Sequence, residues 1–546
     1  MKKRILCAAI AAFMLIPMAA AFSGCSSSSD STVILKVYNW EEYIDEGGEG
    51  SLLYDELAEG ESEFLGDDFL EWYENTMGCE LEVTGEGPSV IDDFEVWYEH
   101  TYGTKVKVEY STFGTNEDMY NEIKLGNKYD LICPSDYMIM KLAAEGRLEK
   151  YEKEFFDDKI EENYYIKNVS PYIQEKFETN AGLPKKESQE ETYYWSEYAA
   201  GYMWGTTGFV YNPEEVDEDE LESLGWQAFV NEGEKYKNKI TAKDNVRDTY
   251  FAALGVTFEK ELLSLADQYA NGEITAKQYT EKITAIFNDT SEETIAKVEP
   301  VLMSIKKNIY SFETDTGKAD LVNGNINLNY AWSGDAVYAM DLAEEENDKY
   351  YNYFVPLSGS NLWFDGWVMP SGVTERGTKH AAQAFVNFLS MPYNAMRNSY
   401  YIGYTSAISG ENAEMVDYID YLHGEEESDS TIEYDLSTFF GEEAGAITII
   451  ADAEQATSRQ LYAQYPSTEV LARCAVMNYY DEQESVRINE LWSRVKAETL
   501  DAWAIVVICL AVVAIVLVVL FVKFKGKIDL FRHRPKKGYH KVEDPE

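Results

Sequence analysis

Tryptophan and aspartate stand close together twice in the second half of the chain, in Trp363-Phe364-Asp365 and in Trp332-Ser333-Gly334-Asp335. Residues two apart in a strand point to the same face. Trp363 can therefore form an aromatic wall of a binding site, while the carboxylate of Asp365 pairs with an ammonium group of a ligand. Trp363 alone could belong to the core, but an acid is hard to explain as packing in the apolar run that continues to Met369. A carboxylate must balance most of the positive charge of such a ligand, since a ring face contributes only ~0.5 to 2 kcal/mol to binding of a cation.

The second pair follows the apolar segment Ile326 to Ala331. Gly334 permits a sharp turn, so Asp335 would lie near the start of the next helix. The helix dipole keeps a carboxylate ionised at that place. The residues alone leave two roles open for Asp335, which are contact with a ligand and capping of the helix.

Composition limits what the chain can bind. Its 546 residues include 98 acidic and 46 basic residues, which give a formal net charge of −52. Phosphate backbones demand basic patches, so we expect no nucleic-acid partner, whereas a cationic ligand is compatible with this charge. The cysteines away from both ends, Cys79, Cys133 and Cys474, lack metal-ligand spacing, and no catalytic motif is present. We expect no metal, no cofactor and no catalytic residue.

The two ends of the chain predict attachment to a membrane. Residues 1–25 resemble a lipoprotein signal peptide, in which basic residues and an apolar run lead to Cys25 as the acylated residue, and a linker, residues 26–32, follows. Residues 502–522 carry no charge and are long enough to cross ~30 Å of hydrocarbon. The basic tail, residues 523–546, predicts a cytoplasmic C-terminus. The intervening chain would then lie on the extracytoplasmic face of the cell membrane.

The first part of this intervening chain predicts an α/β sheet. Helical spacing indicates one helix from Asp92 and another over residues 116–125. Ligands of such sheets lie at the carboxyl ends of the strands, where Trp40, Tyr43 and Tyr137 stand. Three segments have the pattern of strands: residues 33–37, 106–110 and 130–133.

An acidic segment, residues 46–90, contains an apparent internal repeat. Residues 67–78 echo residues 92–103, from an Asp-Asp-Phe start to a final glycine, and Val83 echoes Val108. We interpret the segment as a duplicated helix-strand unit that packs on the sheet or loops beside it. A docking appendage is the alternative interpretation.

Several short motifs, taken together, resemble one family. They are Tyr38-Asn39-Trp40-Glu41-Glu42-Tyr43, Pro134-Ser135-Asp136-Tyr137, Trp204-Gly205, Trp332-Ser333-Gly334-Asp335 and Trp363-Phe364-Asp365. Their order and spacing, from about Val33 to Lys496, resemble the spermidine/putrescine-binding proteins of polyamine ABC importers. The resemblance implies an α/β, two-lobed periplasmic-binding-protein-like (type II) clamp with a hinge, to which this chain adds the C-terminal transmembrane helix.

The resemblance also implies a domain order. We expect the first part of lobe 1 over residues 33–210, with the insertion 46–90 inside it. Lobe 2 would follow over residues 211–364, and residues 365–410 would return to lobe 1. A helical part, residues 411–498, would pack on the lobes.

The ligand implied by the family is a flexible alkyl chain with ammonium groups. Such a ligand needs carboxylates for its charges and aromatic walls for its methylenes. The resemblance points to these ligand contacts: Trp40, Glu42, Tyr43, Ser135, Tyr137, Asp248, Trp332, Asp335, Trp363, Asp365 and Tyr404.

Three positions depart from the family pattern. Glu41 stands where Thr or Ser is common, Asn245 where some spermidine binders have an aspartate, and Met477 near the place of a glutamine in some members. The last two departures favour putrescine over spermidine, although Glu41 or Glu42 could supply the missing charge.

We therefore predict a binding subunit without enzymatic activity. It would hold a polyamine between two lobes and deliver it to ABC permease subunits, while Cys25 and residues 502–522 contact membrane lipid. Two alternatives remain open at this point. One is an extracellular carbohydrate-active enzyme with paired carboxylates roughly 5 to 9.5 Å apart, and the other is a tethered ligand sensor.

Overall fold

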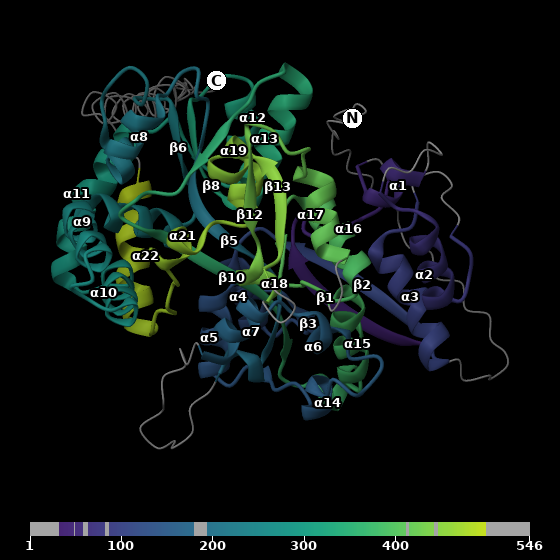
Figure 1. Ribbon diagram of the computed structural model, residues 1–546. Coiled ribbons are helices and arrows are strands. Elements are labelled where there is room, and N and C mark those ends of the chain that lie inside the picture. Colours follow the sequence, from purple (N-terminus) through teal and green to yellow (C-terminus); the bar gives the residue numbers. More distant parts are fainter. Residues whose placement is uncertain are drawn as a thin grey trace, which may run out of the picture. The chain divides into compact units, whose positions relative to one another are not determined.

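The computed structural model describes residues 32–48, 50–57, 64–81, 87–179, 194–410, 414–441 and 446–497 (Figure 1). The chain forms two compact units, residues 1–491 and 492–546, and the sheet belongs to the first. The predicted signal peptide with Cys25, most of the linker, the segment 502–522 and the basic tail lie outside the described residues. Within the described ranges, no helix is both long and apolar enough to cross a bilayer.

Two long strands, β5 (Ala199–Tyr211) and β10 (Ser360–Pro370), form the middle of the sheet (Figure 1). They pair antiparallel, with Leu362 opposite Thr206 and Val368 opposite Ala199. Every residue of both strands is buried, so both faces of each strand are covered by packing. The main sheet runs in the order β2-β1-β3-β10-β5-β8-β6-β7.

The first half-sheet consists of β1 (Val33–Trp40), β2 (Val106–Phe113), β3 (Leu131–Ile132) and β4 (Leu148–Glu149). β1 lies parallel to β2 and β3, while β3 and β4 pair antiparallel with β10. Buried Val106 and Val108 alternate with exposed Lys107 and Glu109, as a strand with one solvated face requires. The three strands and two helices predicted for this region are confirmed. The helices of this half are α3 (Val90–Tyr102), α4 (Asn116–Leu125), α5 (Asp136–Ala144), α6 (Tyr164–Asn168), α7 (Pro171–Thr179), α14 (Val373–Arg376), α15 (Lys379–Leu389) and α16 (Pro392–Ile402).

The second half-sheet consists of β6 (Ile240–Lys243), β7 (Phe312–Glu313), β8 (Leu328–Trp332) and β9 (Asn352–Phe354). β8 pairs antiparallel with β5 from Thr207 to Tyr211 and parallel with β6, which pairs with β7. β5 therefore belongs to both half-sheets. The helices of this half are α8 (Glu218–Leu224), α9 (Val246–Ala270), α10 (Ala276–Phe287), α11 (Glu292–Asn308), α12 (Gly317–Val322) and α13 (Ser333–Asn347).

The region predicted as a helical part over residues 411–498 also contains strands. β12 (Thr431–Asp435) and β13 (Thr448–Asp452) pair antiparallel as a separate sheet, and β14 (Cys474–Ala475) pairs with β10. β13 buries Ile449 and Ala451 and leaves its other residues partly exposed, which is the alternation of a strand. The helices here are α17 (Glu414–His423), α18 (Ser437–Phe440), α19 (Ala453–Thr457), α20 (Gln460–Gln464) and α21 (Thr468–Ala472).

The predicted insertion contains α1 (Leu52–Leu57) and α2 (Asp67–Met77). The two helices of the apparent repeat, α2 and α3, pack on each other. Each ends at a glycine in the left-handed region, Gly78 with φ of 71° and Gly103 with φ of 64°, a cap that glycine adopts without steric cost. The repeated helix is confirmed, whereas the expected strand around Val83 lies in a segment that the structure does not describe.

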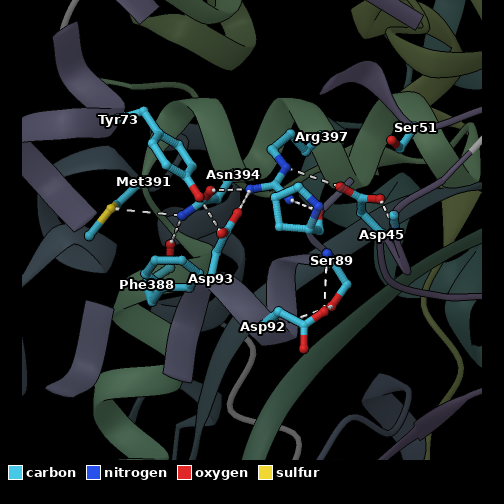
Figure 2. Close-up of polar contacts among 12 residues, drawn as sticks. Asp45, Ser51, Tyr73, Ser89, Asp92, Asp93, Phe388, Met391, Asn394 and Arg397 are labelled. Atoms are coloured by element: carbon cyan, nitrogen blue, oxygen red, sulfur yellow. Dashed lines mark hydrogen bonds and ion pairs between the residues drawn. The ribbon is translucent and has the colours of Figure 1, made fainter. Parts of the chain in front are cut away.

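A fully buried arginine joins the insertion to the first half-sheet (Figure 2). Arg397 on α16 contacts Oδ2 of Asp45 at 3.0 Å and Oδ2 of Asp93 at 2.6 Å, and it donates to the carbonyl of Pro88 at 3.0 Å. The hydroxyl of Tyr73 on α2 donates to the other oxygen of Asp93 at 2.6 Å. One cation therefore pairs with two buried carboxylates that lie on either side of the insertion.

Replacement of this arginine should destabilise the protein strongly. Arg397→Met leaves Asp45 and Asp93 buried without a counter-charge, so the free energy of unfolding should fall by about 3 to 5 kcal/mol in urea denaturation. Lys277→Met, which removes an exposed pair with Glu281 on α10, is the matched control and should leave stability nearly unchanged. Equal stability of the two variants would contradict this account of the Arg397 cluster.

Candidate functional site

A cavity of about 610 Å³ is lined by residues of both half-sheets. Residues that the sequence predicts as ligand contacts all contribute to its lining, although their contact with a ligand remains a prediction. They are Trp40, Glu42, Tyr43, Ser135, Tyr137, Asp248, Trp332, Asp335, Trp363, Asp365 and Tyr404. Glu41, Asn245 and Met477, which depart from the family pattern, line it as well.

Strand ends and helix starts bring most of these side chains together. Trp40 ends β1 and Trp332 ends β8, while Asp248 and Asp335 lie in the first turns of α9 and α13. Side chains gather in this way at the carboxyl edge of an α/β sheet. The remaining residues outside β10 lie in loops or at the start of α5: Glu42, Tyr43, Ser135, Tyr137 and Tyr404.

Trp363 and Asp365 reach the cavity from within β10. The register between β10 and β5 shifts between Phe364 and Gly366, so Asp365 has no partner on β5 and forms an isolated bridge with Ser135. Irregularities of this kind redirect a side chain next to a functional site. Trp363 and Asp365 both line the cavity, in agreement with the strand-face argument from the sequence.

The lining is strongly acidic. Lys318 is the one basic residue among the described residues that line the cavity. The carboxyl groups of the lining outnumber this single lysine and create a negative potential, which favours a cationic ligand over a neutral one. The carboxyl groups of the lining are Glu41, Glu42, Glu46, Asp136, Asp248, Asp315, Asp335, Asp341, Glu345 and Asp365.

Aromatic rings form the walls, and two glycines of the sequence motifs make room for them. The ring of Tyr404 lies with its centroid 5.2 Å from that of Tyr43 and 5.6 Å from that of Trp363. A Cβ at Gly205 would come within 2.8 Å of the Trp363 ring, and a Cβ at Gly334 would overlap the Tyr404 ring. The absence of side chains at Gly205 and Gly334 therefore leaves room for the rings of Trp363 and Tyr404 in the cavity wall.

Asp365 is a buried carboxylate with an unsatisfied oxygen. It is 5 % exposed, and the hydroxyl of Tyr43 donates to its Oδ2 at 2.9 Å. Its Oδ1 has no hydrogen-bond partner among the described residues. Burial raises the pKa of Asp365 to about 7, and the side chains of Ser135 and Tyr43, which stabilise the ionised form, oppose this rise only in part. A cation placed at Oδ1 would restore the charge balance of this group.

Asp248 provides a second acid deep in the cavity. It is 5 % exposed, and burial raises its pKa to about 6, although the positive charge of Lys243 opposes the rise. Asn245, three residues earlier, is the N-cap of α9 and accepts a hydrogen bond from the backbone N–H of Arg247 at 2.7 Å. The residue that departs from the family pattern thus has a structural role in starting the helix.

Asp335 is already paired within the protein. Tyr404 donates to its Oδ1 at 3.0 Å, Lys318 lies 3.4 Å from the same oxygen, and Lys243 lies 3.2 Å from Oδ2. Although burial alone would raise the pKa of Asp335, the charges of Lys318 and Lys243 hold it below its ordinary value. Asp335 lies in the first turn of α13, and its hydrogen bonds in the structure go to side chains of Tyr404, Lys243 and Lys318 rather than to the backbone at the helix start.

Sequence reasoning did not find the two lysines or Arg247. A signal was present for Lys243, because it ends the buried strand Ile240–Lys243 in a chain with twice as many acids as bases. Arg247 lies 4.3 Å above the centroid of the Tyr137 ring, and the hydroxyl of Tyr137 donates to Glu117 at 3.2 Å. These contacts fix Tyr137 from two sides, and Arg247 joins α9 of the second half-sheet to α5 of the first.

Comparison with known proteins agrees with this geometry. The sequence pattern of the bacterial extracellular solute-binding proteins matches residues 89–421. The chain belongs to this family. The match covers strands and helices of both half-sheets and ends within α17, so the solute-binding protein carries its insertion largely before the matched region.

Two curated relatives illustrate the likeness. This solute-binding protein is 24% identical over 304 residues to the spermidine/putrescine-binding periplasmic protein of Salmonella typhimurium, which covers 55% of this chain and 70% of the relative. It is 26% identical over 292 residues to the putrescine-binding periplasmic protein SpuD of Pseudomonas aeruginosa, which covers 53% of this chain and 67% of that one. The family resemblance predicted from the sequence is confirmed.

A solved structure shows the same fold. The TpPotD lipoprotein of Treponema pallidum superimposes with a TM-score of 0.50 at 16% identity, over 85% of this chain and 99% of that one. The predicted two-lobed fold of periplasmic binding proteins is confirmed.

Neutralising Asp365 should stabilise the ligand-free solute-binding protein in a pH-dependent way. Because the folded-state pKa of about 7 lies above the ordinary value of 3.8, ionisation of Asp365 lowers stability as the pH rises through this range. Asp365→Asn should therefore raise the free energy of unfolding by about 2 to 4 kcal/mol at pH 8, and by less than half as much at pH 5. Urea denaturation at both pH values measures this, with the exposed Asp429→Asn as control. A gain that does not depend on pH would contradict the assignment.

Proposed function

We propose that this protein captures a polyamine, such as putrescine or spermidine, between its lobes and presents it to the permease of an ABC importer. One observation carries the proposal. Oδ1 of Asp365 is buried in an acidic cavity with aromatic walls and has no hydrogen-bond partner among the described residues. An ammonium group at this oxygen would supply both a hydrogen-bond donor and a counter-charge.

The remaining lining suits the rest of a polyamine. Rings such as Trp363, Tyr43 and Tyr404 offer apolar surface to methylene groups, while Asp248 offers a second carboxylate. A neutral sugar would leave the buried charge of Asp365 uncompensated, which disfavours the alternative of a carbohydrate-active enzyme. We therefore propose binding without catalysis.

The names of the relatives support the same ligand class. Those from Salmonella typhimurium and Pseudomonas aeruginosa are named for binding spermidine and putrescine or putrescine alone. Closure of the two lobes around the ligand gives the protein a shape that differs from the open form. We expect the permease to recognise the closed form and to accept the ligand from it. β5 and β10, which run between the lobes, are the expected hinge strands.

Calorimetry of the purified full-length protein in detergent tests the ligand class. Putrescine and spermidine should bind, and neutral sugars should not. Asp365→Asn should weaken polyamine binding by roughly 2 to 5 kcal/mol, because it leaves an ammonium group without its buried counter-charge. Asp429→Asn, an equal charge change on an exposed loop, should leave affinity unchanged. Binding of sugars but not of polyamines would sink the proposal.

We also propose that two anchors hold the protein at the outer face of the membrane. Acylated Cys25 provides one and the apolar segment 502–522 the other. A single lipid chain gives only marginal attachment, so a second anchor makes retention stable.

The second anchor can be tested by removing the first. Cys25→Ala should abolish acylation yet leave much of the protein in the membrane fraction, because residues 502–522 still span the bilayer. A variant truncated after residue 497 with Cys25→Ala is the control and should be released. Complete release of the full-length Cys25→Ala protein would refute the transmembrane segment.

A further inference from the structure

Two lysines from different elements converge on Asp335. Lys243 ends β6, Lys318 lies in the first turn of α12, and each contacts one oxygen of the carboxylate. Lys243 also donates to the carbonyl of Thr314 at 3.0 Å and lies 3.4 Å from Glu313. Three interactions therefore hold the ammonium group of Lys243 beside Asp335.

The ammonium groups of both lysines also lie over aromatic rings near the cavity. The ammonium group of Lys243 lies 4.2 Å from the centroid of the Trp332 ring, and that of Lys318 lies 4.9 Å from the centroid of the Tyr338 ring. The side chains of Lys243 and Lys318 are only 2% and 15% exposed. The protein thus supplies, from its own chain, the cation–π and ion-pair contacts that a ligand ammonium would make here.

A ligand ammonium at Asp335 would meet two like charges at close range. Both Asp335 oxygens are engaged, whereas Oδ1 of Asp365 is free of partners among the described residues. Like charges a few ångströms apart repel strongly in a poorly solvated cavity. Asp335 and Asp365, which the sequence predicts alike as ligand contacts, are therefore not equivalent.

We propose that Lys243 and Lys318 are specificity-determining residues, which keep Asp335 as their own counter-ion and exclude a ligand ammonium from it. The substrate class is then a linear amine that places one ammonium at Asp365 and any further ammonium at the other carboxylates of the lining. This inference rests on the proposed polyamine binding. Lys318 sets how much a second ligand charge contributes to affinity, because it is the one basic residue among the lining residues that the structure describes.

Calorimetry with putrescine and n-butylamine separates the contribution of the second charge. In Lys318→Met, Oδ1 of Asp335 keeps only the hydrogen bond from Tyr404, Asp315 loses its ion pair with Lys318, and the cavity gains one net negative charge. The preference for putrescine over n-butylamine should then rise by about tenfold over wild type. Lys297→Met removes an exposed lysine paired with Glu293 on α11 and should leave this preference unchanged. Lys318→Gln serves as the second variant if the methionine variant does not fold.

The double variant Lys318→Met with Asp335→Asn checks the role of Asp335. It removes the acid that Lys318 neutralises together with the lysine, so its preference for putrescine over n-butylamine should return to within about twofold of wild type. An unchanged preference in Lys318→Met, or a preference in the double variant that stays tenfold above wild type, would overturn the inference while polyamine binding stands. If neither amine nor spermidine binds the wild-type protein, the proposed function fails and the inference fails with it.

Discussion

The pairing of β5 with β10 supports both half-sheets, because every other strand of the main sheet attaches to this pair directly or through a neighbour. β3 and β4 pair with β10, while β8 and β9 pair with β5. The same two strands also build the site. β10 carries Trp363 and Asp365, and β5 supplies Gly205, whose missing side chain admits the Trp363 ring. A change that shifted this pairing would therefore disturb the scaffold and the cavity together.

Burial of carboxylates is costly, and the cavity meets this cost in different ways. Asp335 is neutralised by two lysines of the chain. Asp136 accepts backbone N–H groups of Tyr137 and Phe364. Asp365 keeps one oxygen without a partner among the described residues, so its ionised form remains unfavourable until a cation arrives. Under the proposed function, affinity for a cation would come from a group that destabilises the empty protein, a relation expected of binding sites.

Local sequence patterns were sufficient for much of the fold. Strands β1, β2 and β3 follow from apolar runs and alternation, which are properties of neighbouring residues. The cavity residues could be gathered because strand ends of an α/β sheet meet at one edge. Ion pairs between residues that are far apart in the sequence leave no such local pattern. Lys243 and Asp335 are 92 residues apart, and Arg397 and Asp45 are 352 apart, so their charges balance only once the chain has folded.

The insertion is part of the site's support rather than an appendage distant from it. Arg397 ties Asp45, where the insertion begins, to Asp93 on α3, just beyond its end, and Tyr73 on α2 completes the cluster (Figure 2). Glu46 and Gly50 of the insertion line the cavity together with Glu41 and Glu42. Because a buried ion pair is lost as a unit when one partner moves, Arg397 fixes the chain that leads from Trp40 into the insertion. The extra segment thereby adds the negative charge of Glu46 to the cavity at a position supported by the first half-sheet.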